Sequence, residues 1–271
     1  MPFAPANGVA LYYELAGDGD RLLFVSGTGG DLRRQRMLFQ GPLTENFAVL
    51  AYDQRGLGQS AVPEGPYTMA DYADDAAGLL GAVGWDACFV VGVSFGGMVA
   101  QELAIRHPDR VRRLVLACTS SGGAGGASYP LHELADLHPG ERLVRQIEVM
   151  DTRWDAAWRQ AHPEMVRLIA EGMGQGPDEG LARRGTKLQL EARRHHDTAA
   201  RLRVIRCPTL VCGGRFDGIA PPANSEFLAR GIPGARLAMF DGGHTFFMQD
   251  PTALPAMVRF LQGDSAVGTA P

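Results

Sequence analysis

The sequence predicts an α/β fold: a mostly parallel central sheet flanked by helices, with an inserted helical cap. Two observations support this prediction. Short apolar runs alternate with helical patterns along most of the chain, and such alternation is typical of parallel sheets covered by helices on both faces. One long stretch, residues 121–203, interrupts the alternation with helical patterns and no convincing strand.

The expected strands are short and are separated by turn residues or by helices. They comprise residues 9–15, 22–26, 48–52, 88–93, 114–118, 209–212 and 236–240. The helical patterns around them comprise residues 68–83, 95–107, 222–230 and 251–261. Helices in these positions would cover both faces of the sheet.

The interrupting stretch opens with a glycine- and serine-rich segment that is typical of a flexible hinge. Its helical patterns comprise residues 131–136, 141–150, 155–161, 164–173 and 180–203. We therefore expect a core domain of residues 1–120 and 204–262, a helical cap of residues 121–203, and a flexible tail of residues 263–271. Inserted caps often cover an active site and supply part of its walls.

The composition favours a soluble protein. The chain has 271 residues, 45% of them hydrophobic, and a formal net charge of −4. It has no basic patch for nucleic acid, no apolar run near the roughly 20 residues of a membrane span, and no secretory signal pattern. The cysteines have no zinc-like spacing and are expected to be buried thiols of a cytoplasmic protein: Cys88, Cys118, Cys207 and Cys212. No metal or cofactor is expected, and oligomeric state is not predicted.

The pentapeptide Gly92-Val93-Ser94-Phe95-Gly96 lies where an expected strand ends and an expected helix begins. It fits the pattern G-x-S-x-G, in which a sharp turn exposes the serine hydroxyl at the carboxyl end of a strand. The glycines leave room for the turn to close. A tight turn without catalytic function would also need small residues. In this context we interpret Ser94 as a candidate nucleophile.

A serine hydroxyl needs a base, and His244 is the candidate. It follows the last expected strand after two glycines, which allow the loop to bring the imidazole back over the sheet edge. A structural role is the alternative. His107 is expected to end the helix that follows Ser94, at a distance from the serine. The run His195-His196-Asp197 is a weak metal-site candidate, because neighbouring positions on a helix point apart.

Asp217 is the favoured partner for His244. It follows the expected strand at residues 209–212, and it would hold the imidazole in the tautomer that accepts the serine proton. The alternative is an N-cap or an Asx turn ahead of Pro221-Pro222. Asp241 competes for the same role, although it is close to His244 in sequence. The chain order Ser94, Asp217, His244 is that of α/β-hydrolases.

An oxyanion hole would complete the site. One donor is expected from the backbone N–H of Phe95, the residue after the nucleophile. The second is expected from the loop Ser26-Gly27-Thr28-Gly29-Gly30, most plausibly from the backbone N–H of Thr28. A glycine-rich phosphate loop is the alternative, but the chain has neither of the common phosphate-binding glycine patterns here.

Together these motifs resemble the α/β-hydrolase superfamily over nearly the whole chain, and within it the 3-oxoadipate enol-lactonase-like serine esterases. Ser26 stands where many relatives have histidine. The resemblance implies the α/β-hydrolase fold and a hole built from backbone groups, which this change leaves intact. The motifs that carry it are the loop at residues 26–30, residues 53–60 (Asp-Gln-Arg-Gly-Leu-Gly-Gln-Ser), the turn at Ser94, Arg215-Phe216-Asp217, and Gly243-His244.

The predicted function is a serine hydrolase that cleaves a carboxylic ester or lactone of a small organic molecule through an acyl-enzyme. Two alternatives stay open: hydrolysis of a carbon–carbon bond in a β-diketone or vinylogous diketone, and a small-molecule receptor with slow turnover. Trp154 and Trp158 share one face of an expected cap helix, so they either bind substrate or form the core of the cap. Arg33 and Arg34 either meet a substrate carboxylate or lie in solvent.

Overall fold

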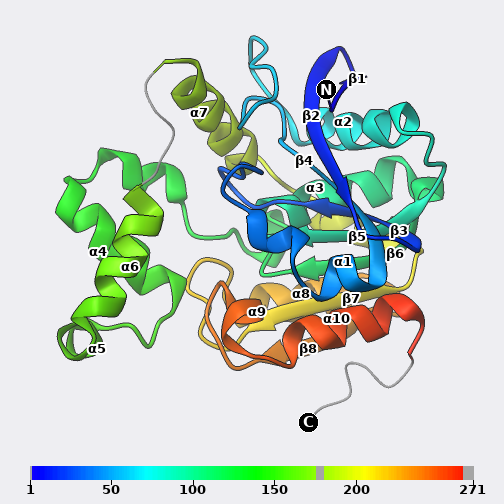
Figure 1. Cartoon of the computed structure of the whole chain (residues 1–271). Coiled ribbons are helices and arrows are strands. Elements are labelled where there is room, and N and C mark those ends of the chain that lie inside the picture. The colour runs from blue at the N-terminus through cyan, green and yellow to red at the C-terminus, as the bar shows by residue number, and fades with distance from the viewer. Residues whose placement is uncertain (1, 175–179, 265–271) are drawn as a thin grey trace.

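The computed structural model describes residues 2–174 and 180–264, and these form one eight-stranded sheet (Figure 1). The strand order is β1-β2-β4-β3-β5-β6-β7-β8; β1 and β2 are antiparallel to their neighbours and the others are parallel. This confirms the predicted mostly parallel sheet. The strands are β1 Phe3–Ala6, β2 Val9–Ala16, β3 Asp20–Val25, β4 Phe47–Tyr52, β5 Cys88–Val93, β6 Val111–Ala117, β7 Thr209–Gly214 and β8 Arg236–Phe240.

Helices cover both faces of the sheet, and each face has its own apolar core. One face packs against α2 (Met69–Ala82), α3 (Phe95–Arg106) and α8 (Pro222–Gly231). The other packs against α1 (Pro42–Asn46), α9 (Phe246–Gln249) and α10 (Ala253–Gln262). The parallel strands therefore end at one shared edge, where the polar segments that follow them meet.

A long insertion, residues 118–208, separates β6 from β7. Its described part holds α4 (Pro139–Met150), α5 (Ala156–Ala161), α6 (Pro163–Gly174) and α7 (Leu181–Arg194). Figure 1 shows α4, α5 and α6 gathered in one lobe, with α7 nearer the sheet. The domain boundaries drawn from the sequence stay a prediction, and the expected tail lies outside the described residues from residue 265 onward. In the described ranges, no helix has the length and apolar character needed to cross a membrane.

Helices α1 and α9 were not predicted, and two further departures from expectation have a clear structural cause. Strand β1 was not predicted. It contains Pro5, which has no N–H and is tolerated because β1 lies at the sheet edge. The single helix expected over residues 180–203 instead ends at Arg194, and a 3₁₀ helix follows at Ala199–Val204. Tertiary pairing ends it: Thr198 N–H donates to the Ser121 carbonyl at 2.8 Å, and Gly122 forms a bridge with Asp197. The two ends of the insertion are thereby joined.

The turn between β5 and α3 depends on close backbone contacts. Ser94 has φ 55° and ψ −117°, a conformation that side-chain-bearing residues rarely adopt. A Cβ on Gly92 would lie 2.5 Å from the Gly96 carbonyl oxygen, and a Cβ on Gly96 would overlap the carbonyl oxygen of Val25. Both glycines are therefore required for α3 to begin directly against the ends of β3 and β5.

Gly96→Ala should destabilise the protein by about 3 kcal/mol or more, because the clashing atoms are backbone and cannot move aside by changing rotamer. The measurement is the free energy of unfolding in urea. Gly81→Ala is the control: Gly81 lies in α2 with nothing within 4 Å of an added Cβ, so the change should stabilise by about 0.5–1 kcal/mol. Equal effects from both substitutions would contradict this account of the turn.

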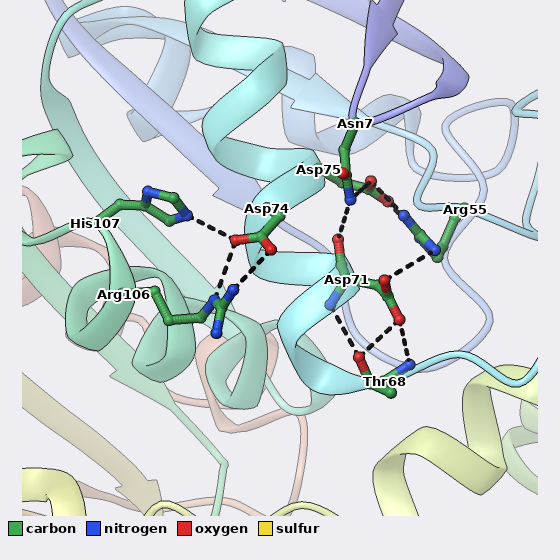
Figure 2. Close-up of polar contacts among 8 residues, drawn as sticks. All are labelled: Asn7, Arg55, Thr68, Asp71, Asp74, Asp75, Arg106 and His107. Atoms are coloured by element: carbon green, nitrogen blue, oxygen red, sulfur yellow. Dashed lines mark hydrogen bonds and ion pairs between the residues drawn. The ribbon is translucent and has the colours of Figure 1, made fainter.

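Two groups of ion pairs flank α2 and differ in burial (Figure 2). On one side, the fully buried carboxylate of Asp75 binds the guanidinium of Arg55 through two hydrogen bonds of 2.6 Å, and Asn7 donates to it at 3.1 Å. On the other, the partly exposed Asp74 pairs with Arg106 and His107. Arg55 follows β4, so the buried pair ties α2 to the loop after that strand.

Asp75→Ala should lower the free energy of unfolding by about 3 kcal/mol, since it leaves the buried guanidinium of Arg55 with only the longer contact to Asp71, at 3.7 Å. Asp74→Ala, one position along the same helix, should cost about 1 kcal/mol or less because its partners reach solvent. Urea titration of both variants measures the difference. A smaller loss for Asp75→Ala than for Asp74→Ala would refute the assignment of the buried pair as the stronger tie.

Candidate active site

Ser94 and Asp217 each lie within hydrogen-bonding distance of His244. The Oγ of Ser94 is 2.9 Å from Nε2 of His244, and Nδ1 of His244 is 2.8 Å from Oδ2 of Asp217. A carboxylate has no proton to donate, so Nδ1 carries the hydrogen and Nε2 is left to accept from the serine. The three residues follow β5, β8 and β7, which are distant in sequence and share the carboxyl edge of the sheet.

Asp217 combines the two roles weighed from its sequence. Besides meeting His244, its Oδ1 accepts the backbone N–H groups of Ile219 and Ala220, each at 2.8 Å. These bonds form the local turn and hold the carboxylate in place. The competitor Asp241 is largely exposed, and its carboxylate pairs with Arg153 at 3.0 Å. The tertiary structure therefore decides between the two acids.

The other predicted histidine roles are local. His107 is the C-cap of α3 and contacts Asp74 at 2.7 Å. His195 is exposed and meets Glu191, whereas His196 is buried with Nε2 3.2 Å from the Ser120 carbonyl. Burial lowers the pKa of His196 to about 4, so this ring is neutral at physiological pH. In residues 2–174 and 180–264 no cluster of His, Cys, Asp or Glu has the arrangement of a metal site.

The backbone N–H groups of Thr28 and Phe95 are free within the described part of the chain. Phe95 opens α3 directly after Ser94, so its N–H lies at the positive end of a helix. Thr28 lies in the turn after β3; an added Cβ on the neighbouring Gly27 would be 3.4 Å from Cβ of Ser94. Two unpaired donors thus belong to segments that contact the serine, as an oxyanion hole requires.

Three glutamines to which the sequence assigned no individual role hold the loop at residues 26–30, which contains Thr28. Nε2 of Gln54 donates to the Ser26 carbonyl at 2.7 Å, and Ser26 Oγ donates to Gln35 at 2.8 Å. Oε1 of Gln189, in α7, accepts the N–H of Gly29 at 2.9 Å. Gln189 is 160 positions from Gly29 and no local pattern marks it, so the sequence held no signal for this contact.

The candidate substrate contacts are less closely tied to the site. Trp154 and Trp158 stack on each other with ring centroids 5.0 Å apart, and Trp158 also stacks on His162. This stack belongs to α5 and the segment before it, in the outer lobe of the insertion; a role in substrate binding stays a prediction. Arg33 pairs with Asp31 at 2.6 Å, and both Arg33 and Arg34 line a small cavity of about 100 Å³ that also reaches Gly29. A larger cavity, of about 450 Å³, lies elsewhere, between α2 and the end of α7.

The geometry suits nucleophilic attack on a carbonyl group. The histidine can remove the serine proton, the aspartate can stabilise the resulting imidazolium, and two N–H groups are free to bind an oxyanion. Ser94 is 8% exposed and the side chain of His244 is 13% exposed, so the reacting atoms are largely enclosed by protein.

Comparison with known proteins agrees with this architecture. Residues 20–151 match a family model described as the alpha/beta hydrolase fold. A protein of Azorhizobium caulinodans named as the carbamate hydrolase RutD is 31% identical, over 97% of this chain and 99% of its own length. The 2-hydroxymuconate semialdehyde hydrolase of Pseudomonas putida is 33% identical, over 71% of this chain and 68% of its own.

A solved structure gives the same result in three dimensions. The enol-lactonase of Burkholderia xenovorans LB400 superimposes with a TM-score of 0.79 at 25% identity, covering 97% of this chain and all of that one. The predicted resemblance, including enol-lactonase-like relatives, is therefore confirmed. With its sheet, its insertion and its hydrolase relatives, the chain belongs to the α/β-hydrolase family.

Proposed function

We propose that this hydrolase cleaves a carboxylic ester or lactone of a small organic substrate, with Ser94 as nucleophile, His244 as general base and Asp217 as the orienting acid. The observation that supports this best is the continuous relay from Ser94 Oγ through both imidazole nitrogens to the Asp217 carboxylate. A purely structural role for the histidine would not account for both of its neighbours, a serine in a strained turn and a buried carboxylate.

The reaction has two similar steps. Ser94 Oγ attacks the carbonyl carbon as His244 takes its proton, and the backbone N–H groups of Thr28 and Phe95 bind the oxyanion. His244 then protonates the leaving alkoxide, which leaves an acyl-enzyme. Water attacks that acyl group with the same base and the same donors, and Ser94 is released.

A second candidate function uses the same triad on a different bond. The relative at 33% identity is named for 2-hydroxymuconate semialdehyde, which is not an ester. Hydrolysis of a carbon–carbon bond in a β-diketone or vinylogous diketone is therefore the alternative. The carbamate hydrolase name of another relative adds carbamates to the substrates worth testing. A receptor with slow turnover would also keep a triad, but would couple ligand binding to a partner protein.

Ser94→Ala should lower kcat for p-nitrophenyl esters and lactones by about 10⁴-fold or more, because no other group can form the acyl-enzyme. The matched control is Ser120→Ala, which removes a buried hydroxyl without a partner among the described residues and should leave kcat near the wild-type value. Undiminished hydrolysis by Ser94→Ala would end the proposal. Faster turnover of vinylogous diketones than of esters by the wild type would favour the alternative.

Gln189→Met should lower kcat/KM about tenfold with little change in KM, because the Gly29 N–H loses its acceptor and the Thr28 donor shifts from the developing oxyanion. Affinity for a trifluoromethyl ketone, which forms an oxyanion on the enzyme, should fall in parallel. Gln101→Met is the control: Gln101 is equally buried but binds the Gly97 and Ser120 carbonyls. Unchanged inhibitor affinity in Gln189→Met would rule out this role.

A further inference from the structure

The end of α4 is bonded to both loops that carry the proposed acid and base. The Val149 carbonyl accepts the N–H of Gly218 at 3.0 Å, and the Met150 carbonyl accepts the N–H of His244 at 2.6 Å. In the other direction, Thr152 N–H donates to the Phe216 carbonyl at 2.9 Å. Each of these contacts is made by His244 itself or by a residue adjacent to Asp217.

These bonds also satisfy a requirement of the helix. The last carbonyls of an α-helix have no partner within it and need donors from elsewhere. Val149 and Met150 are the final two residues of α4. The loops that carry Asp217 and His244 supply the missing donors, so these hydrogen bonds pair backbone groups of the helix end with backbone groups of the loops. A Cβ on Gly243 would overlap the Met150 carbonyl oxygen, which explains a glycine directly before the base.

A fully buried carboxylate, Asp151, follows α4. It accepts the backbone N–H, Nε and Nη2 of Arg153 at 2.7–3.0 Å, and Nε2 of Gln249 at 3.0 Å. Burial raises the pKa of Asp151, but the hydrogen bonds from Arg153 and Gln249 outweigh it and leave the pKa below its ordinary value. The side chain is therefore ionised, and its charge is balanced by Arg153.

Gln249 extends this network to the base loop. Its Nε2 binds Asp151, and its Oε1 accepts the N–H of Gly243 at 2.7 Å. Arg153 reaches the same loops from the other side: it pairs with Asp241 at 3.0 Å and lies over the ring of Phe216 at 4.1 Å. The loops are thus held to residues 149–153 at three places: at Asp241, three residues before the base; beside the acid; and at Gly243, directly before His244.

We propose that Asp151 and Gln249 are positioning residues for catalysis: they lock the backbone before His244 against the end of α4, so that the imidazole spans Ser94 and Asp217. The inference rests on the proposed function, because it gives these residues a role through the general base. The base works when its nitrogens meet both partners within hydrogen-bonding distance, and a displacement of about 1 Å can cost about 100-fold in rate. The insertion is then part of the catalytic framework as well as a cover for the site.

Three variants test this. Gln249→Met removes the bridge from Asp151 to Gly243. Gln249→Glu keeps an acceptor for the Gly243 N–H but sets a second carboxylate against Asp151. In the double variant Asp151→Asn with Gln249→Glu, the asparagine Nδ2 can donate to the new carboxylate, which restores the bridge with its direction reversed. The asparagine gives up the bond from Arg153 Nη2 but keeps an oxygen for the N–H and Nε of Arg153. Asp155→Asn is the control, because Asn can still cap α5 and the change removes a carboxylate from the same segment.

The quantities to measure are kcat, KM and the rate at which a fluorophosphonate labels Ser94. The labelling rate reports base-assisted nucleophilicity without a substrate. We expect Gln249→Met and Gln249→Glu to lower kcat and labelling about 10- to 100-fold with KM within about threefold. The double variant should recover most of both, and Asp155→Asn should match the wild type. Thermal unfolding midpoints identify any variant that is merely unfolded.

The outcomes separate this inference from the proposed function. Wild-type labelling rates in folded Gln249→Met, or no recovery in a folded double variant, would overturn the positioning role while leaving the serine mechanism intact. Failure of the wild type itself to be labelled at Ser94 would instead remove the proposed function. If Gln249→Met does not fold, the comparison of Gln249→Glu with the double variant decides the question.

Discussion

The structure depends on how closely the backbone can approach itself at the carboxyl edge of the sheet. Ser94 reaches this edge in a strained conformation because Gly92 and Gly96 leave no Cβ between α3 and the ends of β3 and β5. Because of this close approach, α3 begins directly after the serine, and the N–H of Phe95 has no partner within the described chain. The proposed nucleophile and one proposed oxyanion donor thus come from a single turn, and the rest of the candidate site is arranged around it.

The insertion contributes to that arrangement from two directions. Gln189 of α7 binds the Gly29 N–H in the proposed oxyanion loop, and the end of α4 binds the loops of Asp217 and His244. Both contacts satisfy backbone groups that would otherwise be unpaired near the site. Movement of the insertion as a rigid body would break these bonds.

Much of the fold followed from local patterns. Seven of the eight strands were recognisable from short apolar runs, and those at the centre of the sheet are almost continuously buried. Strand β1 was missed; it contains Pro5, which is tolerated at the edge of a sheet. Helix ends were harder to predict. The pattern over residues 180–203 is helical throughout, yet α7 ends at Arg194, since pairing of residues 197 and 198 with the start of the insertion competes with the helix.

The sequence by itself determined the α/β architecture, the strand-to-helix turn at Ser94 and the strand ends that carry Asp217 and His244, because each is set by neighbouring residues. The tertiary structure decided what depends on contacts across the chain. It turned Asp241 toward Arg153, placed Asp217 against His244, and brought Gln189, Asp151 and Gln249 to the proposed site. These hydrogen bonds join residues 27 to 160 positions apart. Contacts over such separations leave no local pattern, and for that reason only the folded chain reveals them.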